Sequence, residues 1–441
     1  MRFAIATLGC KVNQYDSAII ESRLSARGMQ RCDFTEPADI YIVNTCTVTD
    51  RADAESLRIA RRARRLNPDA RVVMTGCLAQ ANPDKLAKAS EVDAVVGLGR
   101  LDDLERMIEF GAGERVMVSD LRKQKAMIEL GAVTLDGHTR AFLKLQEGCD
   151  QFCTFCIVPF SRGTSRSVEP RRVMVALDEL HARGFKEVIL SGVHLGGYGK
   201  DLEPRVDLSD LLEMVAERCP IERVRISSLD PEELSDRIVQ IISSCEKFCP
   251  HLHLPLQAGE DELLSKMRRR YQRAHFRERV EKVLTVWPDA AIGTDLIVGF
   301  PGETPRHFES YFDFVEALGL AYFHVFPYSV RAGTTAAKLP GRVNPTEIKR
   351  RAALMRDLGD LKRHQFAQRL VGTRLKVLLE ERAVSGDLRG YSRNYVRVLT
   401  QGPDELINHE VEVEASAVEG AQLVAEIVRP STRDTASGRA S

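Results

Sequence analysis

The chain has 441 residues, of which 44% are hydrophobic and 29% are charged. At roughly 150 residues per domain, this length predicts about three domains and excludes a single small binding module. The 63 basic and 63 acidic residues balance, so any attraction to nucleic acid requires a local basic surface.

The longest stretch without Lys, Arg, Asp or Glu covers residues 317–330, which is shorter than the roughly 20 residues of a membrane-spanning helix. The N-terminal residues contain no basic leader and no long apolar region. We therefore expect a cytoplasmic protein without a membrane partner. Its ten cysteines indicate metal or redox chemistry, because a reducing compartment disfavours structural disulfides.

Strand and helix patterns alternate over the first 80 residues, with strands at 2–6, 39–43 and 71–75 and helices at 17–27 and 54–66. This alternation predicts a parallel sheet of the Rossmann or flavodoxin-like kind. A cysteine follows each strand: Cys10, Cys46 and Cys77. Because the carboxyl ends of parallel strands share one edge, we expect these cysteines to meet. The alternative is that they are ordinary small core residues.

A connector is predicted over residues 100–140, and the alternation then resumes. The predicted strands cover residues 141–145, 187–191, 223–227, 251–254, 291–297 and 322–326, and the helical patterns between them cover 171–183, 208–217, 233–243 and 304–318. Six such units predict a partial (β/α)6 TIM barrel, whose active site lies at the carboxyl ends of the strands.

The C-terminal region begins with a basic helical stretch at residues 345–370 and continues with short strands at 374–379, 394–398, 409–413 and 422–427. This pattern predicts a small β-barrel. Residues 431–441 are small and polar, which is typical of a disordered tail.

The strongest motif is the C-x3-C-x2-C spacing of Cys149, Cys153 and Cys156, directly after the first barrel strand. Three thiolates in one loop are suited to an iron–sulfur cluster. A cluster of four irons would keep one iron without a protein ligand, and that iron could bind a cofactor or substrate. The alternative is a structural zinc ion, but no His or Cys lies between Cys156 and His181, so zinc needs a distant fourth ligand.

With this loop on a β/α half-barrel, the sequence resembles the radical S-adenosylmethionine enzymes. The three earlier cysteines and a C-terminal barrel similar to a TRAM domain resemble the methylthiotransferase subfamily. Residues 7–16 (TLGCKVNQYD), 191–199 (SGVHLGGYG) and 324–329 (HVFPYS) are most similar to the branch that acts on N6-threonylcarbamoyladenosine at tRNA position 37. Sister branches act on isopentenyladenosine or on a ribosomal-protein aspartate.

The resemblance implies a methylthiotransferase domain at residues 1–125, a radical S-adenosylmethionine core at 135–368 and a TRAM-like RNA-binding domain at 369–430. It also implies two [4Fe–4S] clusters, one on Cys10, Cys46 and Cys77 and one on Cys149, Cys153 and Cys156. S-adenosylmethionine would serve both as radical source and as methyl donor. The expected partners are the tRNA anticodon stem-loop, a low-potential electron donor and a sulfur donor.

By the same resemblance, glycine-rich strand ends line the S-adenosylmethionine site, and we expect cofactor contacts from Ser191, Gly192, Gln257, Asp295 and Gly299. His251 and His253 alternate along one strand and so share a face. We interpret them as hydrogen-bonding residues inside the barrel, with a metal pair as the alternative.

RNA contacts are predicted where arginines and tyrosines interleave, since arginine suits phosphate and tyrosine stacks on bases. The candidates are Arg268, Arg269, Tyr271, Arg389, Tyr391, Arg393 and Tyr395. Cys32, Cys219, Cys245 and Cys249 are expected not to be ligands. The leading interpretation is a tRNA-modifying radical transferase. A non-enzymatic alternative is an RNA-binding protein with structural metal, which would be a colourless zinc protein.

Overall fold

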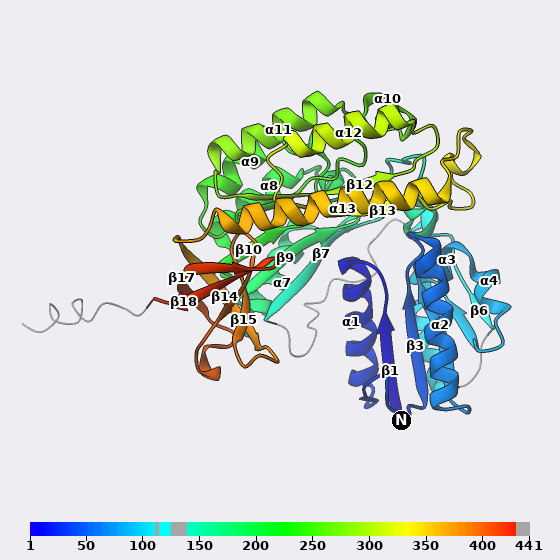
Figure 1. The fold of residues 1–441 in the computed structure, drawn as a ribbon. Helices are drawn as coiled ribbons and strands as arrows, with labels where there is room; N and C mark the ends of the chain where they lie inside the picture. Colours follow the sequence, from blue (N-terminus) through cyan, green and yellow to red (C-terminus); the bar gives the residue numbers. More distant parts are fainter. Residues whose placement is uncertain (111–113, 125–138, 429–441) are drawn as a thin grey trace, which may run out of the picture.

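Residues 1–110, 114–124 and 139–428 are described by the computed structural model (Figure 1). The N-terminal part is a sheet of parallel strands in the order β2-β1-β3-β4-β5-β6. Its elements are β1 (Arg2–Thr7), α1 (Lys11–Ala26), β2 (Gln30–Arg31), β3 (Ile40–Thr45), α2 (Asp50–Leu66), β4 (Arg71–Gly76), α3 (Cys77–Ala81), α4 (Pro83–Ala87), β5 (Ala94–Val96), α5 (Leu101–Phe110) and β6 (Val116–Met117). The flavodoxin-like prediction is confirmed.

The central strands β3 and β4 of this N-terminal sheet are buried on both faces, as expected for a parallel sheet covered by helices. Strand order reverses between β1 and β3, and the crevice at such a switch point is where open α/β sheets bind ligands. The predicted connector over residues 100–140 is wrong in its first part, because α5 packs on this sheet and β6 is its edge strand. Residues 125–138 lie outside the described residues.

The central part contains the six parallel strands that the sequence predicts, and the partial barrel is confirmed. They are β7 (Arg140–Glu147), β9 (Glu187–Gly192), β10 (Arg223–Ile226), β11 (His251–His253), β12 (Ala291–Val298) and β13 (Tyr322–Pro327), with β8 (Arg166–Ser167) at one edge. Two isolated parallel bridges connect the two hydrogen-bonded sheets: Val224 of β10 pairs with Phe248 before β11, and Ser228 after β10 pairs with His253 of β11. The helices are α6 (Val158–Arg162), α7 (Pro170–Ala182), α8 (Leu208–Arg218), α9 (Asp236–Ser244), α10 (Asp261–Lys266), α11 (Arg273–Val286) and α12 (Pro305–Ala317).

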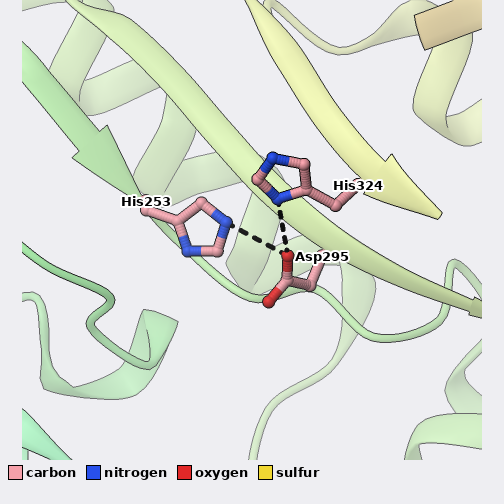
Figure 2. A group of neighbouring side chains, drawn as sticks. All are labelled: His253, Asp295 and His324. Carbon is pink, nitrogen blue, oxygen red and sulfur yellow. Dashed lines mark hydrogen bonds and ion pairs between the residues drawn. The ribbon is translucent and has the colours of Figure 1, made fainter. Parts of the chain in front are cut away.

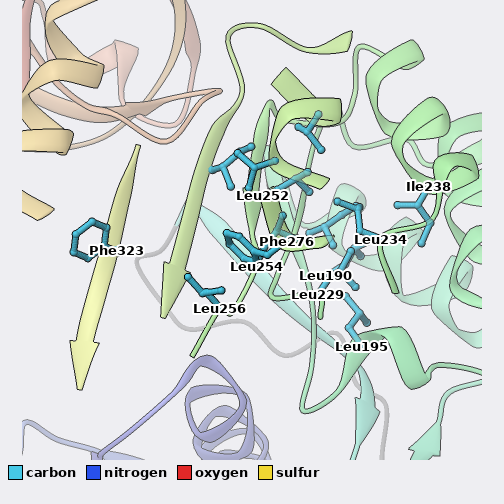
Figure 3. Close-up of a cluster of buried hydrophobic side chains, with 14 of the residues drawn as sticks. Leu190, Leu195, Leu229, Leu234, Ile238, Leu252, Leu254, Leu256, Phe276 and Phe323 are labelled. Atoms are coloured by element: carbon cyan, nitrogen blue, oxygen red, sulfur yellow. The ribbon is translucent and has the colours of Figure 1, made fainter. Parts of the chain in front are cut away.

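The two faces of the central strands differ in chemistry, because side chains alternate along a strand. Outward residues such as Leu190, Leu252 and Phe323 join the large apolar core under the helices (Figure 3). The intervening inward residues are mostly polar: Lys144, Gln146, Glu187, Ser191, Arg223, Arg225, His251, His253, Asp295, Tyr322 and His324. The N-terminal sheet and the C-terminal barrel lie on this inner side (Figure 1). The central strands therefore present a polar inner face to the N-terminal sheet and to the C-terminal barrel.

The C-terminal part is a closed barrel in the order β14-β15-β16-β18-β17, reached through α13 (Pro345–Gln368). Its strands are β14 (Arg374–Arg382), β15 (Leu388–Ser392), β16 (Arg397–Thr400), β17 (Glu410–Glu419) and β18 (Gln422–Ile427). The small β-barrel is confirmed, but the strand expected at 394–398 is displaced and begins only at Arg397, as β16. Residues 393–396 form the turn of a hairpin, and Tyr395 has a positive φ of 67°. The predicted tail lies outside the described residues.

A buried charge network joins the barrel to the central strands. Glu187 accepts hydrogen bonds from Arg225 at 3.0 Å and Arg223 at 2.9 Å. Arg223 also pairs with Glu410 of β17, and Arg225 donates to the carbonyl oxygen of Arg393 at 2.9 Å. Burial alone would raise the pKa of Glu187, but the two guanidinium groups outweigh it and lower that pKa to about 2. This ionised carboxylate fixes both arginines beneath the barrel.

Within the described part of the chain, no helix combines the length and apolar character that crossing a membrane requires.

Candidate functional site

The first cysteine triplet lies at the carboxyl edge of the N-terminal sheet, as expected. Cys10 precedes α1, Cys46 follows β3 and Cys77 begins α3. Gly9, between β1 and Cys10, has a φ of 98°, and a Cβ there would lie 3.0 Å from the Cys46 sulfur. Glycine both permits this turn and leaves space beside that sulfur.

A buried arginine from the central part reaches this triplet. Arg162, on α6, donates from Nε to the Cys77 sulfur at 3.3 Å and from Nη2 to Asp16 of α1 at 2.8 Å. Its Nη1 donates to Glu147 at 2.6 Å. Burial raises the pKa of Cys77 to about 12, and the Arg162 charge opposes that rise. Arg162 thus favours the thiolate form, which is the form that binds metal.

The second triplet lies in the loop after β7. Gly148, before Cys149, has a φ of 74°, and a Cβ there would lie 1.9 Å from the carbonyl oxygen of Thr164. The start of the loop therefore packs tightly against the residues that follow α6. Arg269 donates to the Cys153 sulfur at 3.4 Å and pairs with Asp230. Each triplet thus has a buried arginine hydrogen-bonded to one sulfur.

The donor set fits an iron–sulfur cluster better than a single ion. All six cysteines are free thiols, and burial raises the pKa values of Cys149 and Cys156 to about 12, so binding metal would displace their protons. Among the described residues, neither triplet has all its sulfurs within 4.8 Å of one another. Tetrahedral zinc, with Zn–S bonds of about 2.3 Å, would hold its sulfurs roughly 4 Å apart. A larger inorganic core suits the wider spacing.

A cavity of about 180 Å³ is lined by residues of the second triplet's loop and by residues that follow Cys46 of the first triplet. Its lining includes Cys156, and also Val48 and Thr49, which lie two and three residues after Cys46. Gln257 and Asp295, two of the predicted cofactor contacts, also line it. The cavity therefore adjoins Cys156 directly and the first triplet through the residues after Cys46.

The other predicted cofactor contacts lie elsewhere. Ser191 and Gly192 end β9, and Gly192 lies against Gln146. Gly299 faces α13, because a Cβ there would meet Ile348 at 2.4 Å. The structure thus brings Gln257 and Asp295 to the cavity, while the open side of Gly299 is filled by another helix.

The predicted RNA contacts differ in their exposure to solvent. Arg268 is exposed, but the Arg269 side chain is only 6% exposed and Tyr271 only 5%. The Tyr271 hydroxyl donates to the carbonyl oxygens of Pro255 and Leu256 at 2.7 and 2.9 Å. This burial favours a role for Arg269 and Tyr271 beside the cysteine loop over a contact with RNA.

In the C-terminal barrel, Tyr391 and Tyr395 stack with ring centroids 5.0 Å apart. Both line a cavity of about 590 Å³ that His324 and Tyr322 of β13 also line. Arg389 pairs with Glu381 and Arg393 with Glu410, so these two arginines are engaged within the barrel.

Sequence reasoning missed several site residues. Arg162 gave no signal, because its contact with Cys77 spans 85 positions. His194 contacts Gln151 of the cysteine loop at 3.1 Å and Glu233 at 2.6 Å. The glycine-rich run around His194 could have indicated it, because that run follows a barrel strand.

Comparisons with known proteins agree with this arrangement of fold and site. A partial barrel with a three-cysteine loop defines the radical S-adenosylmethionine class, and the model described as "Radical SAM superfamily" matches residues 143–315. The model described as "Uncharacterized protein family UPF0004" matches residues 2–97. In a solved structure, the radical S-adenosylmethionine methyltransferase TsrM from Kitasatospora setae aligns with a TM-score of 0.56 over 74% of each chain. At 15% identity, this likeness concerns the fold.

Curated relatives match over nearly the whole chain. The threonylcarbamoyladenosine tRNA methylthiotransferases MtaB of Bacillus subtilis and Aquifex aeolicus are each 36% identical, covering 93% and 92% of this chain and 92% and 98% of their own. The tRNA-2-methylthio-N6-dimethylallyladenosine synthase of Thermoanaerobacter pseudethanolicus is 33% identical over 91% of this chain and 82% of its own. The chain therefore belongs to the radical S-adenosylmethionine methylthiotransferase family, and it is a transferase.

Proposed function

We propose that this chain adds a methylthio group to C2 of N6-threonylcarbamoyladenosine at position 37 of tRNA. The observation that carries the proposal is that one cavity is lined both by Cys156 and by Val48 and Thr49, which follow Cys46 closely in the chain. A reaction that removes hydrogen from a carbon atom and then adds sulfur to it needs the radical source and the sulfur source beside that same carbon atom. The names of the relatives in Bacillus subtilis and Aquifex aeolicus support the substrate.

The cofactors of this proposal are iron–sulfur clusters and S-adenosylmethionine. Cys149, Cys153 and Cys156 would hold the cluster that works with S-adenosylmethionine, and Cys10, Cys46 and Cys77 would hold a second cluster. Bound there, these groups would supply a 5′-deoxyadenosyl radical that removes hydrogen from C2, a sulfur atom and a methyl group.

The protein would contribute position and charge. Arg162 and Arg269 each donate to one cysteine sulfur, and such donors orient thiolate ligands and tune the metal they bind. Asp16 and Asp230 fix these arginines in turn. Gln257 and Asp295 line the same cavity as Cys156 and would offer polar groups to a bound cofactor or nucleoside.

The RNA would lie along the C-terminal barrel, a TRAM-like unit over residues 369–430 that follows a radical core at 135–368 and a cluster-binding unit at 1–125. Tyr391 and Tyr395 line the larger cavity, and aromatic side chains of this kind stack on unpaired bases. The proposed partner is therefore the anticodon stem-loop. A strongly reducing protein and a sulfur donor complete the set of partners.

The test is the nucleoside content of bulk tRNA, measured by mass spectrometry in cells with and without the gene. We expect loss of 2-methylthio-N6-threonylcarbamoyladenosine and accumulation of the unthiolated nucleoside. Complementation with the wild-type chain should restore the product, and complementation with Cys153→Ala should not. A change confined to isopentenyladenosine derivatives would replace the proposed substrate. No change in any nucleoside would refute tRNA as the substrate.

A further inference from the structure

A polar cluster on the inner wall of the barrel is left unexplained by the cysteine sites. His253 on β11 and His324 on β13 direct ring nitrogens at one oxygen of Asp295 on β12 (Figure 2). The distances to Asp295 Oδ1 are 3.3 Å from His253 Nε2 and 3.1 Å from His324 Nδ1. Ser228 fixes the other nitrogen of His253 through a contact of 2.8 Å. The second oxygen of Asp295 takes part in neither of these contacts (Figure 2).

The cluster lies between the two cavities. Asp295 lines the cavity that contains Cys156, and His324 lines the larger cavity that contains the two barrel tyrosines. Phe326, two residues beyond His324 on the same face of β13, lines the first cavity, and Tyr322, two residues before it, lines the second. A nucleoside whose base lies near Cys156 could therefore place a substituent against His324 and Asp295.

Exposure rises steadily across the three side chains. The His253 side chain is 11% exposed, the Asp295 side chain 27% and the His324 side chain 53%. Burial would raise the pKa of Asp295, but hydrogen bonds from the two histidines hold that pKa well below its usual range. A carboxylate that stays charged beside a cavity needs polar partners, because covering it with an apolar group would cost free energy.

We propose that His253, Asp295 and His324 recognise the substituent on N6 of the substrate adenine and favour threonylcarbamoyl over an apolar group. The inference rests on the proposed function and names how that site selects its substrate. A threonylcarbamoyl group carries urea N–H groups and a hydroxyl, which suit the Asp295 carboxylate. It also carries a carboxylate, which suits His324 and the nearby Arg363 of the same cavity. An isopentenyl group offers none of these atoms.

The test compares three anticodon stem-loop RNAs that differ only at N6 of adenine 37, which carries threonylcarbamoyl, isopentenyl or hydrogen. Dissociation constants are measured by fluorescence anisotropy without reductant, so that no turnover occurs. The reconstituted wild-type protein should bind the threonylcarbamoyl RNA most tightly. In His324→Leu and Asp295→Asn, we expect the preference for threonylcarbamoyl over isopentenyl to fall about tenfold or more, since sites built to hydrogen-bond a group discriminate strongly against analogues that lack it.

His181→Leu is the matched control, because His181 is an exposed histidine on the outer helix α7, and its preference should equal that of the wild type. An unchanged preference in both His324→Leu and Asp295→Asn would overturn the inference. So would a loss of S-adenosylmethionine binding in Asp295→Asn without a change in RNA preference, which would assign Asp295 to the cofactor. A stoichiometric divalent ion that both variants lose would overturn it in favour of a metal site.

The binding experiment separates a failure of this inference from a failure of the proposed function. The anisotropy ratio needs no thiolation. A wild-type protein that prefers the threonylcarbamoyl RNA but fails to thiolate it under turnover would count against the proposed function alone. A protein that thiolates that RNA, while His324→Leu and Asp295→Asn keep the wild-type preference, would count against the inference alone.

Discussion

Replacing Glu187 with Gln should loosen the C-terminal barrel from the central strands. Glu187 is fully buried and is the shared acceptor of Arg223 and Arg225. The variant leaves two buried guanidinium groups with one carboxylate fewer, which costs about 3–5 kcal/mol for a broken buried ion pair. The pKa gives a similar figure: a fall from 4.5 to about 2 corresponds to about 3 kcal/mol of stabilisation at neutral pH.

The pH dependence has a defined sign. Because the folded pKa of Glu187 is depressed, its stabilisation is fully present above about pH 4.5 and is lost as the pH falls towards 2. The difference in stability between wild type and Glu187→Gln should therefore be largest at neutral pH and shrink below pH 4.5.

Hydrogen exchange measured by mass spectrometry reports this local change. A loss of about 3 kcal/mol corresponds to roughly hundredfold faster exchange in peptides that open by this route. We expect the acceleration in peptides of β15 and β16, which flank the turn that Arg225 contacts, and no change in the N-terminal sheet. Glu222→Gln is the matched control, because Glu222 is exposed. Equal protection of β15 in wild type and Glu187→Gln would refute the anchoring role.

Three further predictions follow from the cysteine loops and the tyrosine pair. Cys153→Ala should abolish formation of 5′-deoxyadenosine, while Cys46→Ala should keep it and lose the methylthiolated product; full thiolation by Cys46→Ala in a mass-spectrometric assay would contradict two separate sites. Gly148→Ala should lower the amount of iron bound per chain. Gly148 has a φ of 74°, and the added Cβ would lie 1.9 Å from the carbonyl oxygen of Thr164, so an alanine there must displace the loop. Gly184→Ala, with a φ of 85° but open space around it, should bind iron normally, and equal iron in the two variants would refute the argument. Tyr391→Ala should weaken binding of the anticodon stem-loop about tenfold or more, as expected for a lost base stack, and an unchanged anisotropy titration would exclude stacking on Tyr391.

Local patterns were sufficient for the framework of the site. The six barrel strands and the three N-terminal strands before Cys10, Cys46 and Cys77 follow from hydrophobic runs separated by helical periodicity. Since the carboxyl edge of a parallel sheet is fixed by topology, the meeting of the first three cysteines was predictable. The spacing of Cys149, Cys153 and Cys156 is a local signal and needs no tertiary information.

The errors have tertiary causes. The sequence predicts a strand at 394–398, but residues 393–396 form a hairpin turn and the strand begins at Arg397. Ser392 donates to Asn394 within the turn, and Arg225 of the central strands donates to the carbonyl oxygen of Arg393 from outside it, so part of what fixes the turn is a distant contact. The burial of Arg269 and Tyr271 likewise depends on distant partners, Asp230 and the carbonyl oxygens of Pro255 and Leu256.

The contact of Arg162 with Cys77 has a consequence for how this chain can be recombined. The first cysteine site takes all its sulfurs from the N-terminal sheet, but its charge partner comes from α6 in the central part. A chimera that joins the N-terminal sheet of one relative to the core of another would therefore separate a thiol from the guanidinium matched to it. Exchange should keep this contact only when the N-terminal parent supplies the acid and the thiol at the positions of Asp16 and Cys77 and the core parent supplies an arginine at the position of Arg162.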